Sequence, residues 1–271
     1  MINDPVLAVA VRAARRAGSI ITDAARDLKR LASHAKAHGD IASAADTDAE
    51  KAIIATLRAA FPGHAILGEE TGETPATKPS GATAGCRWIV DPIDGTANFV
   101  HGFPYYAVSI ALTHGQDITH AVVHDPVHDE LFIAIRGRGA QLNGAPIRVS
   151  ACTSLERALV GTVFPTPASP RMSTYLTVFN TLIPRCAGIR RAGACALDLA
   201  YLAAGRLDGF WVMSLKPWDV AAGALIVREA GGRVGDFAGS GDFLRTNEVI
   251  AAAPGIFNSL RETVARALPP R

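Results

Sequence analysis

The chain has 271 residues, 49% of them hydrophobic, which is ample for one large domain with a sizeable buried core. Its 27 Lys and Arg residues nearly balance 25 Asp and Glu residues, and a net charge of +2 is too small to attract nucleic acid or an anionic membrane surface. We therefore expect a small-molecule partner.

The cysteines and the N-terminus bear on the cellular compartment. Cys86, Cys152, Cys186 and Cys195 are scattered and form no Cys-x-x-Cys pair, so we expect reduced thiols that pack as small apolar residues. The chain begins MINDPVLAVAV, with no basic leader, and no apolar run approaches the about 18 residues of a membrane span. These features predict a cytoplasmic protein.

Helical patterns fill the first 60 residues or so. An N-cap signal at Asp4 and Pro5 opens a helix whose apolar residues recur at helical spacing as far as Leu28. A polar stretch, SHAKAHGDIASAADTD, follows. A second helix is then expected from about Thr47 to Ala60.

Strand patterns come next. AILGEE is typical of a short strand that ends in acid, TGETPATKPSGATAGC is a Pro/Gly-rich loop, and WIVD is the next strand. From Tyr105 to Val149 the alternation of apolar and polar residues, with a turn at Asn143 and Gly144, predicts an antiparallel meander.

The second half alternates between the two patterns. ALVGTVF and DGFWVM are expected as strands, as are segments near Arg233 and Val249. Helices are expected at SPRMSTYLTVFNTLI, at CALDLAYLAAG, at WDVAAGALIVREAGG and after Pro254. Alternating layers of helices and sheets indicate an α/β or α+β layered sandwich.

No internal repeat or low-complexity segment divides the chain. We expect a single domain over residues 1–271, with two sub-halves, 1–150 and 151–271, joined near Ser150 as the alternative.

The segment WIVDPIDGTANF places two carboxylates across a tight bend. A buried strand delivers Asp91, and Asp94, Gly95 and Thr96 form a turn that opens a short helix. This spacing lets both carboxylates converge above the strand end, while Gly95 lets the backbone approach a ligand and the helix start points free N–H groups outward. On chemistry alone, an ordinary Asp-Gly turn explains the segment equally well.

Two further acidic motifs lie elsewhere in the sequence. Glu69 and Glu70 follow the AIL strand, and such a pair alone is most often a solvated strand end. Asp219 opens an apolar helix within KPWDVAAG, where an N-cap role competes with a ligand role. The order GEE, then DPIDGT, then WDVAAG is nevertheless too specific for chance assembly.

These motifs, with GIRRAGACALDLAYLAAGRLDGFW and REAGG, resemble those of the inositol monophosphatase family over nearly the whole chain. The resemblance implies an αβαβα sandwich and a homodimer. It also implies lithium-sensitive, Mg²⁺-dependent hydrolysis of a small phosphate monoester, such as inositol monophosphate or a related polyol or sugar phosphate, by a metal-activated water.

The resemblance assigns metal ligands as well. Glu69, Asp91 and the backbone carbonyl of Ile93 would hold one Mg²⁺. Asp91, Asp94 and Asp219 would hold a second, and Glu69 would touch a weaker third ion. All-oxygen ligands favour Mg²⁺ over zinc, and the cations would offset repulsion of about 3 kcal/mol per carboxylate pair at an effective dielectric constant near 20.

The resemblance implies catalytic roles for Glu69, Asp91 and Thr96, and in these roles Thr96 helps Glu69 to orient the attacking water. The N–H groups of Gly95 and Thr96 would hold the phosphate. Lys36, in the polar stretch after the first helix, would match a loop lysine of the family if one residue were deleted after it.

The expected substrate wall departs from the family pattern. By resemblance Ala194, Val212 and Asp219 lie beside the alcohol half of the substrate. Val212 occupies the place of a glutamate that bonds sugar hydroxyls, and Ala194 that of a common hydroxyl residue. Histidinol phosphate, fructose 1,6-bisphosphate and the 3′-phosphate of an adenosine nucleotide therefore stay open as substrates, as does a regulatory or scaffold protein that retains the fold.

Overall fold

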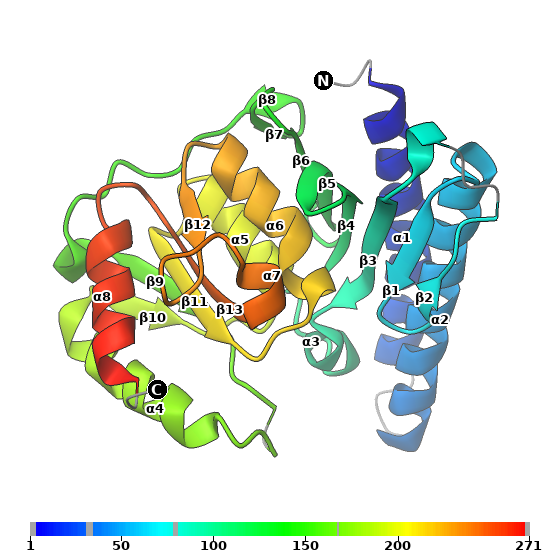
Figure 1. Ribbon diagram of the computed structural model, residues 1–271. Helices are drawn as coiled ribbons and strands as arrows, with labels where there is room; N and C mark the ends of the chain where they lie inside the picture. The colour runs from blue at the N-terminus through cyan, green and yellow to red at the C-terminus, as the bar shows by residue number, and fades with distance from the viewer. Residues whose placement is uncertain (1–3, 31–34, 78–80, 167, 269–271) are drawn as a thin grey trace.

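The computed structural model describes residues 4–30, 35–77, 81–166 and 168–268. Within them, layers of helices alternate with two β-sheets (Figure 1). The helices are α1 (Pro5–Arg30), α2 (Ala35–Ala60), α3 (Thr96–Val100), α4 (Met172–Leu182), α5 (Cys195–Ala203), α6 (Pro217–Glu229), α7 (Phe243–Thr246) and α8 (Phe257–Ala267). α1 and α2 cover the outer face of the first sheet, α5 and α6 lie between the sheets, and α4 and α8 cover the second. The predicted αβαβα layering is confirmed.

The first sheet is a mostly antiparallel meander, as predicted. Its order is β2-β1-β3-β4-β5-β6-β7-β8, with only the β1 and β3 pair parallel. The strands are β1 (Ala65–Gly68), β2 (Gly72–Thr74), β3 (Cys86–Asp94), β4 (Ala107–His114), β5 (Asp117–Asp125), β6 (Glu130–Ile135), β7 (Ala140–Leu142) and β8 (Ala145–Pro146). β3 and β4 are central and buried, so an acid at the end of β3 lies deep in the molecule.

The second sheet is mixed. Its order is β10-β9-β11-β13-β12, in which β10, β9 and β11 are parallel and β13 is antiparallel to both of its neighbours. The strands are β9 (Leu159–Thr162), β10 (Gly188–Arg190), β11 (Gly209–Met213), β12 (Arg233–Gly235) and β13 (Glu248–Ala252). Three short 3₁₀ turns, at Gly81–Thr83, Leu155–Arg157 and Ile183–Arg185, complete the elements.

The N-terminal cap follows the sequence signal. The backbone N–H groups of Val6 and Leu7 donate to the Asp4 carboxylate at 3.0 and 3.1 Å, and Pro5 takes the first helical position. The buried face of α1 then carries side chains that are at most 1% exposed: Leu7, Ala10, Ala13, Ala14, Ala17 and Ile21. This stripe packs α1 against α2 and the first sheet.

The second helix differs from the prediction. α2 begins at Ala35, whereas the sequence pattern predicted a start near Thr47. Ala45 and Ala49 are 4% and 0% exposed, so small residues continue the buried stripe through the polar stretch. The backbone of Lys36 is therefore helical and not part of a loop, and its side chain lies outside the described residues.

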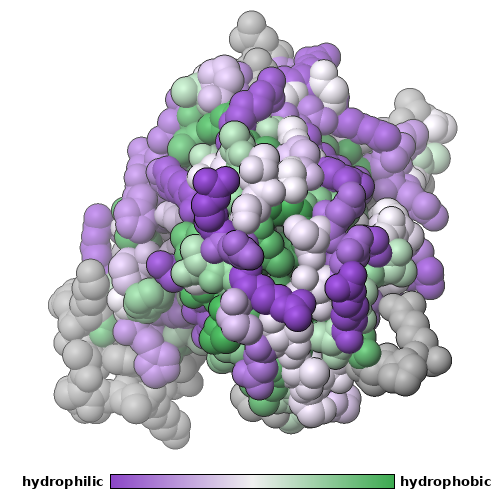
Figure 2. Space-filling view, turned by 90° about the vertical axis from the view of Figure 1, so that its left-hand side faces the viewer, coloured by the Kyte–Doolittle hydropathy of each residue, from purple (hydrophilic) through white to green (hydrophobic). Residues whose placement is uncertain are grey.

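The surface is mixed in character. Seen from the side of α8, hydrophilic side chains cover most of the face, and hydrophobic ones show between them near its middle (Figure 2). In the part of the chain that the structure describes, no helix is long and apolar enough to cross a membrane.

Candidate metal and active site

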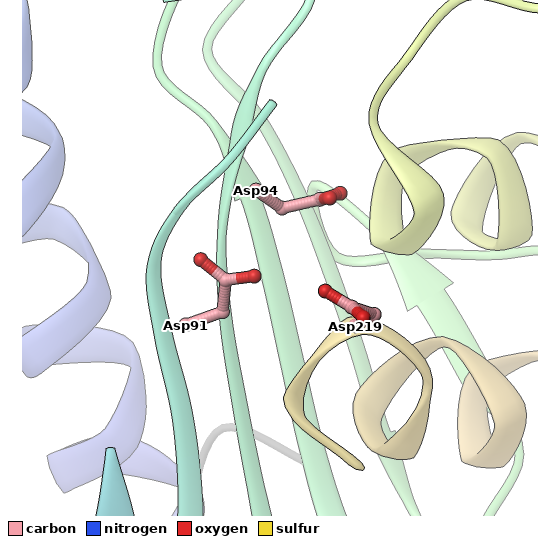
Figure 3. Close-up of side chains that lie close together, drawn as sticks. All are labelled: Asp91, Asp94 and Asp219. Atoms are coloured by element: carbon pink, nitrogen blue, oxygen red, sulfur yellow. The ribbon is translucent and has the colours of Figure 1, made fainter. Parts of the chain in front are cut away.

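Asp91 and Asp94 lie at the end of the central strand β3, and both are buried. In a regular strand, residues three positions apart face opposite sides of the sheet. Here the pairing with β4 shifts register between Asp91, opposite Ser109, and Asp94, opposite Ala107. Such an irregularity twists the strand and redirects side chains. Both carboxylates therefore turn toward one point (Figure 3).

Asp219 comes from the second half of the chain, in the first turn of α6. Its carboxylate accepts a hydrogen bond from the backbone N–H of Lys216 at 2.7 Å and so caps the helix. The same carboxyl group also points toward Asp91 and Asp94 (Figure 3). The capping role and the ligand role, which compete in the sequence, are thus compatible in one side chain.

The three aspartates form a cluster suited to a cation. One oxygen of each of Asp91, Asp94 and Asp219 lies within 4.8 Å of the others. Oδ1 of Asp91 is buried and has no hydrogen-bond partner among the described residues. Several carboxylate oxygens, one of them unsatisfied, are the donor set that a hard divalent cation such as Mg²⁺ takes. The residues present therefore fit Mg²⁺.

The first turn of α5 holds Asp94. Its carboxylate accepts hydrogen bonds from the backbone N–H groups of Cys195 at 2.9 Å, Ala196 at 2.7 Å and Leu197 at 3.4 Å. The positive end of the α5 dipole reinforces this contact. Sequence reasoning missed the contact, because it joins residues about a hundred positions apart.

The acids perturb one another. Burial raises the pKa of Asp91 well above its ordinary value, and the carboxylates of Glu69, Asp94 and Asp219 add to that effect. Burial and then Asp219 raise the pKa of Asp94, against the opposing N–H groups of α5. Burial also raises the pKa of Asp219 to about 6. A bound cation would stabilise the ionised carboxylates, so the cluster favours the binding of a cation.

Glu69 joins the edge of the cluster. It follows β1 and is exposed as a residue, while its carboxyl group contacts that of Asp91. Partial burial of the carboxyl group raises the pKa of Glu69, and a hydrogen bond with Asp91 opposes the rise. Glu69 is not among the three acids whose oxygens converge within 4.8 Å.

Two buried acids of α2 lie beside Glu69, and sequence reasoning missed both. Glu50 is 0% exposed, and its carboxylate accepts the N–H groups of Glu70 at 3.0 Å and Thr71 at 2.8 Å. Asp46 is 4% exposed, and burial, followed by Glu70, Glu69 and Glu50, raises its pKa to about 8. The signal was available, because both acids fall on the helical stripe that continues through Ile53 and Leu57.

The turn after β3 has the expected form. Gly95 has a φ of 98°, and a Cβ there would lie 3.1 Å from both the Ala194 Cβ and the Tyr105 carbonyl oxygen. A larger residue would therefore be strained and crowded at once. The Thr96 hydroxyl donates to the Ile93 carbonyl at 3.0 Å, which brings two predicted site groups together.

The predicted substrate wall is buried. Ala194 precedes α5 and is 1% exposed, and Val212 lies in β11 and is 0% exposed. Both belong to the hydrophobic cluster between the sheets. Their contact with a substrate alcohol stays a prediction.

A cavity of about 1300 Å³ opens between β1, β3 and α6, lined in part by Leu67, Ile89 and Pro217. None of Asp91, Asp94 and Asp219 lines it. The convergence of the acids, and not the size of this cavity, therefore identifies the candidate site.

Comparisons with known proteins point the same way. The family model described as "Inositol monophosphatase family" matches residues 2–269. "Nus factor SuhB" of Pseudomonas aeruginosa is 48% identical over 268 residues, which are 98% of each chain. "Nus factor SuhB" of Escherichia coli is 42% identical over 256 residues, 94% of each chain.

Two solved structures are similar along almost the whole chain. The extragenic suppressor protein suhB of Bartonella henselae has a TM-score of 0.84 at 41% identity, covering 96% of this chain and 98% of that one. An inositol monophosphatase from Anabaena has a TM-score of 0.84 at 33% identity, and the match covers 97% of this chain and 96% of that one.

Proposed function

The chain belongs to the inositol monophosphatase family, and from this premise we propose that it hydrolyses a small phosphate monoester with Mg²⁺. The observation that carries the proposal is the convergence of Asp91, Asp94 and Asp219 within 4.8 Å. Inositol monophosphate or a related polyol or sugar phosphate is the proposed substrate class.

The ligand set we propose is the one that the family resemblance implies. Asp91, Asp94 and Asp219 would share one Mg²⁺, and Glu69, Asp91 and the Ile93 carbonyl would hold another at the edge of the cluster. The contact of Glu69 with Asp91 supports this second site. A weaker third ion at Glu69 completes the proposed set of two to three ions.

Mg²⁺ bound here would act as a Lewis acid and lower the pKa of a coordinated water. The protein groups have separate tasks. Because the Thr96 hydroxyl donates its proton to the Ile93 carbonyl, the Thr96 oxygen is left to accept a hydrogen bond from the attacking water. The Glu69 carboxylate is a second acceptor for that water, and the N–H groups of Gly95 and Thr96 are the proposed phosphate donors.

We propose that the alcohol half of the substrate finds no hydrogen-bonding side chain at positions 194 and 212, where apolar residues are buried. Ala194 and Val212 offer no hydrogen bond to a sugar hydroxyl, so discrimination between small alcohols should be modest. Histidinol phosphate, fructose 1,6-bisphosphate and a 3′-phosphoadenosine nucleotide remain alternatives to an inositol phosphate.

A phosphate-release screen over a panel of phosphomonoesters tests the proposed activity. We expect release in Mg²⁺, loss of release in excess EDTA, and inhibition by millimolar Li⁺ or added Ca²⁺. Undiminished hydrolysis in EDTA, or no hydrolysis of any ester in Mg²⁺, would contradict the proposal.

We also propose a homodimer and a cytoplasmic location. Phe164, Leu176 and Ile183, on α4 and its flanks, are 41%, 45% and 51% exposed, and apolar surface of this kind supports self-association. Light scattering should give twice the chain mass, and Leu176→Lys should reduce it. Cell fractionation tests the location.

A second candidate function is a partner-binding role as a Nus factor. The two relatives of that name described above match this chain over 98% and 94% of its length at 48% and 42% identity, and that similarity favours the role. Replacing such a relative in its own host, by the native chain or by Asp219→Asn, would separate the roles. If both restore growth equally, the Nus role does not require hydrolysis.

A further inference from the structure

A network of hydrogen bonds joins the two halves of the chain beside Asp94. Asn98, in α3, donates through Nδ2 to the carbonyl oxygens of Tyr105 at 2.7 Å and Ala192 at 2.8 Å. Gly193 has a φ of 96°, and a Cβ there would lie 3.2 Å from the Asn98 Nδ2. The close approach of these segments thus holds the chain just before α5 against the turn after β3.

Tyr105 makes a second connection to α5. Its hydroxyl donates to Oδ1 of Asp198 at 2.6 Å, and Asp198 is 1% exposed. The Tyr105 ring also packs edge-on against Tyr201, with centroids 5.6 Å apart. The Tyr105 hydroxyl thus satisfies one oxygen of the buried Asp198 carboxyl group, and Oδ2 has no other hydrogen-bond partner among the described residues, so this one bond holds the side chain.

The two connections bracket the groups that hold Asp94. Asn98 holds Ala192, Tyr105 holds Asp198, and the N–H donors to Asp94 belong to Cys195, Ala196 and Leu197, which lie between them. Any shift of this turn of α5 would carry these donors with it. Asp94 would then rotate away from Asp91 and Asp219.

We propose that Asn98, Tyr105 and Asp198 are positioning residues that fix the first turn of α5 and, through its N–H groups, orient Asp94 in the metal cluster. The inference rests on the proposed function, since it concerns the proposed Mg²⁺ site. Groups that orient metal ligands without touching the metal commonly change its affinity about 10–100-fold when removed.

Three variants test the network. Tyr105→Phe removes only the hydroxyl, Asn98→Asp keeps the size of the side chain but removes both donated bonds, and Asp198→Ala removes the acceptor. Asp198→Asn is the conservative variant, since its amide oxygen can still accept from Tyr105. Tyr106→Phe is the matched control, because Tyr106 packs in the cluster on the α1 side of the sheet, whereas Tyr105 packs on the α5 side.

The readout is Mg²⁺ binding by titration calorimetry, at a temperature where circular dichroism shows every variant folded. We expect the dissociation constant to rise about tenfold or more in Tyr105→Phe, Asn98→Asp and Asp198→Ala. It should stay within about twofold of native in Tyr106→Phe and Asp198→Asn. Tyr105→Phe combined with Asp198→Ala should cost no more than either alone, because both remove one bond.

The outcomes separate this inference from the proposed function. If the native chain binds no Mg²⁺, the metal site itself is wrong. If the native chain binds Mg²⁺ and all variants bind it equally, with only the melting temperature lowered, the network is structural and the inference fails. Should one variant not fold, the other two decide the question.

Discussion

Asp219 shows how one side chain can serve both fold and chemistry. Its carboxylate caps α6 and faces the other two aspartates, and an amide oxygen can keep the first task while removing the charge needed for the second. We expect Asp219→Asn to lower kcat about 100-fold or more while the melting temperature without metal stays the same or rises. Asp242→Asn, at the N-terminus of α7, is the control and should leave both unchanged. Near-native turnover in Asp219→Asn would remove Asp219 from the ligand set.

The raised pKa of Asp46 predicts how the free energy of unfolding depends on pH. Its pKa is raised from 3.8 to about 8, so the folded chain holds a proton there that the unfolded chain has released. The free energy of unfolding should therefore fall as pH rises through the window from about 4 to about 8. In EDTA, the urea midpoint should be lower near pH 9 than near pH 6.

Two variants at α2 check this assignment. Asp46→Asn cannot ionise, so it should narrow the difference between the two urea midpoints. Asp48→Asn is the control, because Asp48 is exposed and pairs with Lys51 at 3.5 Å. An equal change in both variants would mean that Asp46 does not set the pH dependence.

At the scale of single residues, the sequence predicted the three aspartates that come together, but not the residues beside them or the groups that hold them. The motifs identified Asp91, Asp94 and Asp219, and the structure brings those three together. Glu50 and Asp46 were overlooked, although helical periodicity places them on the buried stripe of α2. The α5 donors to Asp94 could not be predicted, since no local pattern specifies a contact between residues 94 and 195.

The turn between β3 and α3 is sensitive to an added methyl group, because Gly95 has a left-handed backbone and close neighbours. Gly95→Ala should cost about 1–3 kcal/mol of stability for the left-handed backbone and should also push against Ala194 at the start of α5. Mg²⁺ affinity should fall as a result. Gly231→Ala is the matched control, because Gly231 has a φ of 89° with nothing within 4 Å.

We expect Gly231→Ala to lose a similar amount of stability with Mg²⁺ affinity unchanged, as measured by urea unfolding and calorimetry. If both variants bind Mg²⁺ as the native chain does, the contact between Gly95 and Ala194 does not position the site.

Elements were predicted well where their apolar residues show a clear period. The meander and the helices α1, α4, α5, α6 and α8 follow clear periodicities. β10 and α7, with three and four residues, are too short to show a period, and they were missed together with β2 inside the expected loop. α2 was predicted too short because its polar residues hid a stripe of alanines.

At the scale of the whole molecule, the prediction of a single domain implies that the chain unfolds in one cooperative transition. The hydrophobic cluster between the sheets combines residues of both halves, such as Val123 and Phe132 with Leu199 and Ile226. We propose that residues 1–150 and 151–271 unfold together. Calorimetric and van't Hoff enthalpies should then agree in one transition. Two resolved transitions, or a calorimetric enthalpy well above the van't Hoff enthalpy, would favour two halves that unfold independently.

The origin of the acids in both halves has a consequence for synthesis on the ribosome. Asp91 and Asp94 emerge long before Asp219, and at about 5–20 residues per second the delay is on the order of ten seconds. During that time Asp91 and Asp94 lack both the carboxylate of Asp219 and the N–H donors of α5. The proposed Mg²⁺ site should therefore form only after Asp219 and α5 have left the ribosome, close to the release of the completed chain.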